Sequence, residues 1–291
     1  GRIPAAMNNV VGLRPTIGLA SVNGLVHNNR FLDVVPVFAQ TVEDAFTVMD
    51  VIRGHDDADP YSRPDADALP RSIAVPEGFR FGVPAAPGLA VLDAHSQAGF
   101  GRAVQALRSL GGEPVEVDFQ LFTQAGRMVF ESALVAERAA SYGRVLDGGE
   151  AAVFPAVASI LQQARRHTGT EAFEAIYRMQ ALRHRARRLF ETRALHCLLT
   201  PTLPRPYTCE EVEADPIARN AEIGHYTYGV AVLDLCALAL PAAIRPDGLP
   251  FGISLVAPAG RDGALRTLGE RFERHVRLAP GIAALPTASF S

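Results

Sequence analysis

The chain opens with the stretch GRIPAAMNNVVGLRPT, which runs from Gly1 to Thr16. By itself this stretch predicts a turn and a short helix, followed by a Gly-Leu-x-Pro-Thr exit that begins at Gly12. Its composition contains no group of side chains that points to catalysis. The fold is therefore inferred from the segments that follow and from the order of residues within the string.

Beyond this stretch, helical and extended patterns alternate. Thr41 to Arg53 predicts a helix, because Thr41 can cap it, Asp44 stands at the reciprocal position and apolar residues recur at helical spacing. A short strand, an amphipathic helix, an alternating strand and further helices are predicted at Arg80–Pro84, Leu92–Leu110, Val115–Phe119 and Phe122–Tyr142. The strand–helix–strand order indicates an α/β layer architecture.

The second half of the chain continues in the same way. A long helix is predicted from Thr170 to Arg193, with Thr168 and Glu171 spaced as a capping box. The remaining elements are a buried strand, two apolar runs joined by a Pro-Asp-Gly turn and a closing helix, at His196–Thr200, Ala237–Ile244, Phe251–Val256 and Arg261–His275.

The bulk composition narrows the classes of partner. The 291 residues are 48% hydrophobic and 20% charged, as in an ordinary globular protein, and the formal net charge of −3 gives no electrostatic reason to expect nucleic acid or an acidic membrane. The three cysteines contain no C-x-x-C pair, and the eight histidines show no metal-ligand spacing. We therefore expect a cytoplasmic protein with no cofactor, no metal, no nucleic-acid partner and no membrane partner.

As a string, the opening stretch resembles the amidase-signature family, in which a Gly/Ser-rich loop ends in the nucleophilic serine. Gly1 matches the variable residue after that serine, Arg2 matches the family arginine, and Val11–Thr16 matches Val-Gly-Leu-Lys-Pro-Thr. Two later strings, Leu199–Thr202 and Gly248–Gly252, match further family landmarks. The resemblance implies an amidase-signature α/β/α sandwich around a mixed sheet, N-terminally truncated. Residues 1–275 would form the downstream part of one domain, and residues 276–291 a C-terminal tail.

The resemblance also implies a serine–serine–lysine relay, in which a buried neutral lysine takes a proton from the nucleophile through a bridging serine. By alignment, the nucleophile is expected immediately before Gly1, with the lysine further upstream, so Gly1 and Arg2 should lie near it. The sequence contains no lysine, since all 28 Lys+Arg positions are arginine. No catalytic residue is therefore expected within this chain.

Within the family, the sequence resembles the allophanate hydrolases, which cleave carboxylated urea in urea and cyanurate nitrogen metabolism. The Asn-Asn pair of the opening string and the segments Glu210–Ala218 and Val232–Ala237 carry this resemblance. Tyr228 and Ala231 depart from it, because those enzymes usually have asparagine at both positions. These departures leave the exact amide substrate open.

Allophanate is small, planar and anionic, so a specific pocket should offer a guanidinium for its carboxylate and a hydroxyl donor. The resemblance implies that Tyr177 and Arg185 on the long helix bind the substrate. Their spacing of eight residues places them about 80° apart around a helix axis, within reach of one small ligand. The alternative is that the surrounding RHRARR segment is a solvated basic face.

Several other functions remain open. The chain could belong to a general amidase or to the amidotransferase that modifies tRNA-bound glutamate, as its A-type subunit, and these alternatives differ in whether they favour an anionic substrate. It could also be a decayed, non-catalytic module that survives as a binding partner. A homodimer is an open alternative for its assembly.

Overall fold

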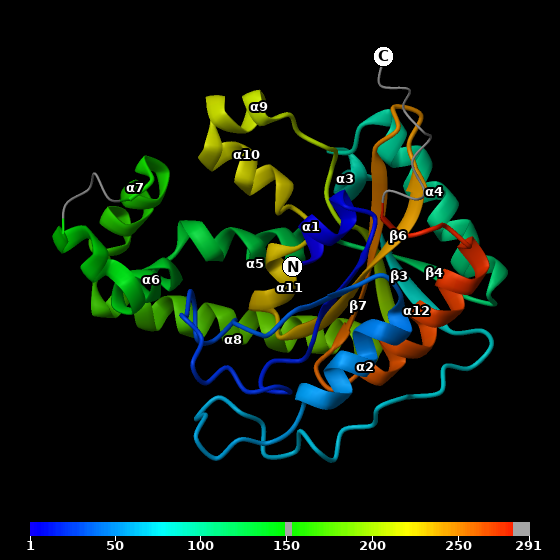
Figure 1. The fold of residues 1–291 in the computed structure, drawn as a ribbon, viewed down its shortest axis with the longest axis horizontal. Coiled ribbons are helices and arrows are strands. Elements are labelled where there is room, and N and C mark those ends of the chain that lie inside the picture. The colour runs from blue at the N-terminus through cyan, green and yellow to red at the C-terminus, as the bar shows by residue number, and fades with distance from the viewer. Residues whose placement is uncertain (149–152, 282–291) are drawn as a thin grey trace.

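The computed structural model describes residues 1–148 and 153–281. Their centre is a seven-stranded mixed sheet with the strand order β2-β1-β6-β7-β5-β3-β4 (Figure 1). The strands are β1 (Val11–Arg14), β2 (Val37–Ala39), β3 (Arg80–Pro84), β4 (Glu113–Val117), β5 (Cys197–Pro201), β6 (Leu235–Ile244) and β7 (Pro250–Pro258). The β6–β7 hairpin lies in the middle, β1 and β2 extend it antiparallel on one side, and β5, β3 and β4 run parallel to one another on the other side.

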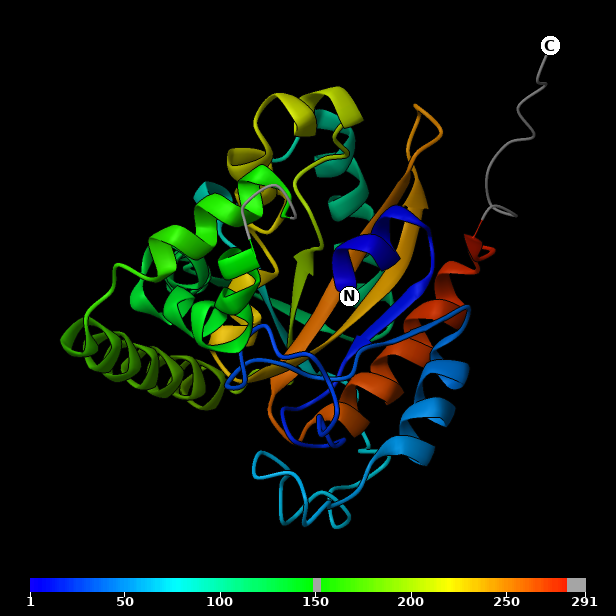
Figure 2. The same ribbon diagram turned by 60° about the vertical axis from the view of Figure 1, so that its left-hand side comes forward.

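Helices cover both faces of this sheet. Phe251 packs against Gly99 of α4 (Ala94–Ser109), whereas the next residue, Gly252, packs under Ala6 of α1 (Arg2–Met7). Because consecutive strand residues point to opposite faces, α4 and α1 lie on opposite faces of the sheet. The helix α12 (Asp262–Val276) packs against α4, and α2 (Val42–Ile52) packs against α12 (Figure 2). The predicted α/β/α sandwich around a mixed sheet is thus confirmed.

A second group of helices lies beside the sheet and contains α8, which is the longest helix in the part of the chain that the structure describes (Figure 1). These elements are α3 (Ala86–Leu89), α5 (Gln120–Glu131), η1 (Ala133–Val135), α6 (Ala136–Tyr142), η2 (Gly143–Gly148), α7 (Pro155–Ala164), α8 (Gly169–Thr192), α9 (Cys209–Ala214), α10 (Pro216–Ile223) and α11 (Tyr228–Val232). Over the described ranges, no helix combines the length and the apolar character that crossing a membrane requires.

Most of the elements that the sequence predicts are confirmed to within about two residues, including the Thr168–Glu171 capping box of α8. The strand predicted at residues 115–119 is shifted, because β4 ends at Val117. Asp118 Oδ1 accepts a hydrogen bond from the backbone N–H of Gln120 at 2.9 Å, which turns the chain into α5 at Phe119. Of the predicted C-terminal tail, residues 276–281 are described, and α12 ends at Val276. The remainder, from residue 282 onward, lies outside the described residues.

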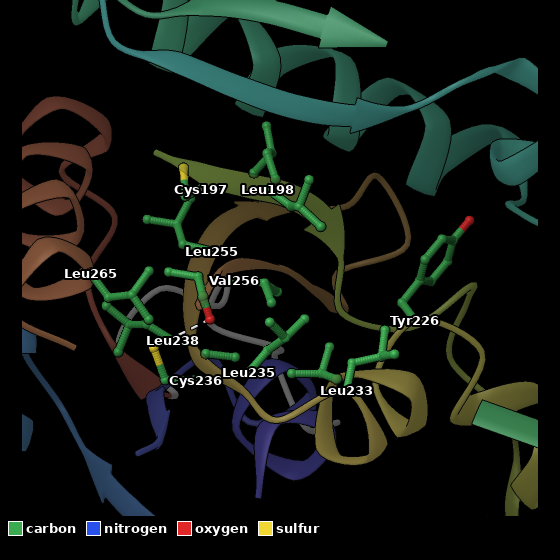
Figure 3. Close-up of a cluster of buried hydrophobic side chains, with 14 of the residues drawn as sticks. Cys197, Leu198, Tyr226, Leu233, Leu235, Cys236, Leu238, Leu255, Val256 and Leu265 are labelled. Atoms are coloured by element: carbon green, nitrogen blue, oxygen red, sulfur yellow. Dashed lines mark hydrogen bonds between the residues drawn. The ribbon is translucent and has the colours of Figure 1, made fainter. Parts of the chain in front are cut away.

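The core between the sheet and α12 is apolar and closely packed. Figure 3 shows Leu238 of β6, Leu255 of β7 and Leu265 of α12 gathered there, and all three are fully buried. Two of the three cysteines lie in the same region as free thiols. Burial raises the pKa of Cys197 to about 12, and Cys236 donates to a backbone carbonyl of β7. Both thiols therefore act as small apolar side chains.

A buried arginine ties the β6–β7 turn to the start of α4. The guanidinium of Arg245 is 5% exposed and lies 2.8 Å from carboxylate oxygens of both Asp93 and Asp247. Asp93 in turn caps α4 by accepting from the N–H of Ser96. Burial raises the pKa of Asp93, but hydrogen bonds from Arg245 and Ser96 outweigh it, and the net shift is downward. The hairpin and α4 are therefore held together by a buried guanidinium whose two carboxylate partners are partly exposed, with 30% and 37% of their side chains accessible.

We expect Arg245→Met to lower the free energy of unfolding by about 1–3 kcal/mol, because it removes the hydrogen bonds of the guanidinium, while water partly screens the two carboxylates that remain. Since the pKa of Asp93 is depressed in the folded state, this contribution is present above the ordinary Asp value of 3.8 and is lost as the pH falls below it. Urea unfolding at pH 7 and at pH 3 measures both effects. Arg188→Met is the matched control, because its pair with Glu191 is exposed and should contribute less than about 1 kcal/mol.

Candidate functional site

The short helix α1 lies close to the sheet because two strand positions beneath it are glycine. A Cβ atom placed on Gly12 would lie 2.5 Å from Ala5 Cβ, and one placed on Gly252 would lie 2.6 Å from Ala6 Cβ. Both alanines are buried. The glycine that ends the Gly248–Gly252 string therefore has a packing role, which is to seat α1 on β7.

The Asn-Asn pair after α1 fixes how the chain enters β1. Asn8 Nδ2 donates to the carbonyl oxygen of Pro4 at 2.8 Å. Asn9 adopts a left-handed backbone conformation with φ 54°, which asparagine tolerates better than most residues. Asn9 Nδ2 also donates to the carbonyl oxygen of Ala279 at 2.8 Å, so the segment after α12 holds this turn. The position of α1 is thus fixed at its C-terminal end as well as underneath.

A cavity of 910 Å³, which we call the α1 cavity, opens beside the N-terminal end of α1. Its walls come from Gly1–Pro4, the end of β1, the loop over residues 28–36, and the helices α5, α6, α7, α10 and α11. Arg2 of α1 reaches across to the carbonyl oxygen of Thr227, the residue that precedes α11. The charged lining residues of the cavity are Arg2, Arg14, Asp33, Glu131 and Arg138. The cavity therefore combines three guanidinium groups with a largely apolar surround.

Arg2 is held at the cavity by one strong contact and keeps a free donor. Its side chain is buried, with 6% of the residue exposed, and Nη2 donates to the carbonyl oxygen of Thr227 at 2.6 Å. Among the described residues, no acceptor lies within hydrogen-bonding distance of Arg2 Nη1. Burial and the charge of Arg14 lower the pKa of Arg2. A charged guanidinium in this position is poorly solvated, and no carboxylate of the described residues pairs with it.

Arg14 repeats this arrangement at the end of β1. Its Nη2 donates to the carbonyl oxygen of Leu32 at 2.9 Å, whereas its Nε is buried and meets no acceptor in the described part of the chain. Burial lowers the pKa of Arg14, and the negative charges of Asp234 and Asp33 offset this only in part. Arg14 is thus a second guanidinium that lines the same cavity, and one of its donors has no acceptor among the described residues.

The carboxylates of the cavity do not neutralise these cations. Asp33 Oδ2 accepts from the backbone N–H groups of Asn28 and Asn29, at 2.9 and 3.1 Å, and lies 3.3 Å from His27 Nδ1. Glu131 is exposed. Unpaired N–H donors on buried guanidinium groups favour an anion, because such a ligand makes charge-assisted hydrogen bonds with them. The α1 cavity is therefore suited to a small carboxylate.

The structure separates the site residues predicted from the sequence into two groups. Gly1 and Arg2 line the α1 cavity. Tyr177 and Arg185 lie on exposed surface of α8, with Tyr177 68% exposed, and neither is among the residues that line this cavity. Their role in substrate binding stays a prediction of the resemblance. The α8 arginine that reaches inward is Arg183, whose Nε donates to a backbone carbonyl of α11 at 2.8 Å.

Sequence reasoning missed two of the three cavity arginines. Arg14 stands where the family string has lysine, so the only signal was a basic residue at the end of that string. Arg138 lies in a segment whose sequence predicts only a helix. Its place at the cavity results from the packing of α6 against η1 and α7, which no local pattern reveals.

Comparison with known proteins gives one family and a set of relatives. The family model described as Amidase matches residues 1–265. Urea amidolyase from Saccharomyces cerevisiae is 33% identical over 286 residues, which cover 95% of this chain and 15% of that protein. The A-type subunit of glutamyl-tRNA(Gln) amidotransferase from a Synechococcus species is 30% identical, with 94% of this chain and 61% of that protein covered.

A solved structure agrees with these matches. Kluyveromyces lactis allophanate hydrolase superposes with a TM-score of 0.90 at 30% identity, and the match covers 100% of this chain and 48% of that one. The chain therefore spans less than two thirds of the length of each of these three proteins.

Proposed function

The chain belongs to the amidase family, and on that premise we propose that it forms the substrate-binding part of an enzyme that hydrolyses the amide C–N bond of allophanate. Two of the similar proteins support the choice of substrate, since one is a urea amidolyase and the other an allophanate hydrolase. The proposal concerns the activity of a larger protein, because the chain spans only part of each relative.

The observation that carries this proposal is the pair of unused guanidinium donors at the α1 cavity. Arg2 Nη1 and Arg14 Nε are buried without acceptors among the described residues. Both arginines line the cavity that Gly1 also lines, and the resemblance implies a nucleophile next to Gly1. A carboxylate bound between the guanidinium groups of Arg2 and Arg14 would hold the other end of a small ureido acid close to Gly1. Such placement is a main source of rate enhancement in hydrolases.

The chemistry of amide hydrolysis indicates which steps the residues of this chain can support. Hydrolysis adds water across the amide C–N bond, and the nitrogen leaves as ammonia after it takes a proton. The residues of this chain bind the carboxylate and surround the ligand with apolar side chains such as Phe130 and Ala231. The lysine base that the resemblance implies would have to come from outside these residues, because the sequence contains no lysine. The chain alone is therefore expected to bind the substrate without cleaving it.

This expectation can be tested on the 291-residue chain directly. Incubated with allophanate, it should release no ammonia above the rate in buffer. The same preparation should bind malonamate, in which a methylene replaces the central N–H of allophanate, in a calorimetric titration. Ammonia release that scales with protein concentration would show that the catalytic groups lie within the chain and would overturn this part of the proposal.

The alternative proposal is that the substrate is a neutral amide, and the similarity to the A-type subunit of glutamyl-tRNA(Gln) amidotransferase supports it. Malonamide, which carries a second carboxamide in place of the carboxylate of malonamate, separates the two alternatives. Preference for malonamate supports allophanate, whereas equal binding of the two supports a neutral amide. Arg185→Ala in the same titration tests the role that the resemblance implies for α8, independently of Arg2 and Arg14.

A further inference from the structure

Arg138 is the third guanidinium of the α1 cavity, and the proposed function does not use it. Only 8% of the residue is exposed, and it lines the cavity from α6. Its Cζ lies 4.7 Å from the centre of the Phe130 ring, which belongs to the wall formed by α5. This cation–π contact fixes the plane of the guanidinium and leaves its N–H groups available.

Arg138 has no counter-ion of its own among the residues that the structure describes. Over residues 1–148 and 153–281, no carboxylate lies within ion-pair distance of its guanidinium. The charge of Asp33 acts on it, but the oxygen Oδ2 of that carboxylate already accepts hydrogen bonds from the backbone of the 28–29 loop. Burial lowers the pKa of Arg138. An arginine nevertheless stays charged at neutral pH, so the cavity holds a desolvated cation that an incoming anion would stabilise.

The cavity has room for a ligand that reaches Arg138 and the first anion site together. Arg2 and Arg14 enter from α1 and β1, whereas Arg138 enters from α6, so the cations lie on different walls. Cavities of about 300–1,000 Å³ hold drug-sized ligands. A volume of 910 Å³ is therefore far more than a molecule as small as allophanate fills.

We propose that Arg138 forms a second anion subsite, so that the α1 cavity binds acyclic dicarboxylates with one carboxylate at Arg2 and Arg14 and the other at Arg138. This proposal deepens the proposed function, because it rests on Arg2 and Arg14 as the first subsite. The ligand class comprises unbranched dicarboxylates as competitors and their longer amide derivatives as substrates. A ligand of matching length gains a second charge-assisted contact, whereas shorter or longer ligands do not.

The test compares succinate, glutarate and adipate with the monoamide of each acid, by calorimetric titration of the 291-residue chain. At one chain length, the dicarboxylate should bind at least tenfold more tightly than its monoamide. In Arg138→Met this advantage should fall below twofold, while the affinity for malonamate should fall by about fourfold at most, because this ligand loses only the long-range attraction of the charge. Arg138→Lys keeps the charge and should retain part of the advantage. Thermal unfolding of each variant identifies any loss of fold.

The outcomes separate this inference from the proposed function. If malonamate binds in a way that depends on Arg14 and no dicarboxylate exceeds its monoamide, the second subsite is wrong and the first stands. If a dicarboxylate advantage appears and survives in Arg138→Met, Arg138 is not its source. If malonamate fails to bind while the advantage depends on Arg138, the subsite is supported and the proposed function fails.

Discussion

Replacing Arg14 by methionine should weaken the binding of malonamate to the chain by roughly 100-fold, which corresponds to about 2.7 kcal/mol. Methionine fills much of the same volume but removes the buried Nε donor and one of the positive charges at the α1 cavity. Hydrogen bonds to charged groups contribute about 1.5–3 kcal/mol, and loss of the long-range charge adds to this. Calorimetric titration at moderate ionic strength measures the change.

Two controls make this prediction specific. Arg14→Lys restores the charge without the planar donor set, so it should recover part of the affinity. Malonamide binding should be nearly the same in the original chain and in Arg14→Met, because a neutral ligand does not depend on the cation. A parallel loss for malonamate and malonamide would mean that the substitution damages the cavity as a whole. Arg14→Met also loses the hydrogen bond from Arg14 to the carbonyl oxygen of Leu32. Thermal unfolding of the variant shows whether this loss destabilises the fold.

Gly252→Val should reduce malonamate binding by at least 30-fold and destabilise the chain by about 1–3 kcal/mol, a typical cost of overpacking. Any Cβ at this position lies 2.6 Å from Ala6 Cβ and 2.9 Å from Ala6 Cα. These two atoms cannot move away by a side-chain rotation, because their positions are fixed by the backbone of α1. The helix α1 would have to move away from β7. Because α1 carries Gly1 and Arg2, its displacement would also separate Arg2 Nη2 from the carbonyl of Thr227.

The matched control for this substitution is Gly101→Ala in α4, where an added Cβ meets no atom within 4 Å. Alanine in a helix interior is favoured over glycine by about 0.5–1 kcal/mol, so this variant should be slightly more stable and should bind malonamate normally. If Gly252→Val binds malonamate as well as Gly101→Ala does, the close packing of α1 on β7 does not position the residues that bind malonamate.

The sequence predicted those parts of the structure that depend on local patterns. The capping box at Thr168 and Glu171 begins α8 as expected, and β3 has the predicted bounds of Arg80 and Pro84. The three-residue strand β2 was missed, because it is too short for a period to appear and is defined by its pairing with β1.

The site was only partly predictable for the same reason. Arg2 was found because it lies within a string that matches a family, and the string also includes Arg14, although its closeness to Arg2 follows only from the packing of α1 over β1. Arg138 is distant in sequence from both and reaches the cavity through the tertiary packing of α6. Tyr177 and Arg185 were assigned by resemblance, and their role awaits the Arg185→Ala titration.

We expect the α1 cavity to recognise a carboxylate through Arg2 and Arg14. The most direct measurement is a pair of titrations of the unmodified chain, one with malonamate and one with malonamide, which differ in shape very little and in charge by one. We expect malonamate to bind at least tenfold more tightly, with the preference shrinking as ionic strength rises. Equal affinities for the two ligands, or tighter binding of malonamide, would contradict the account.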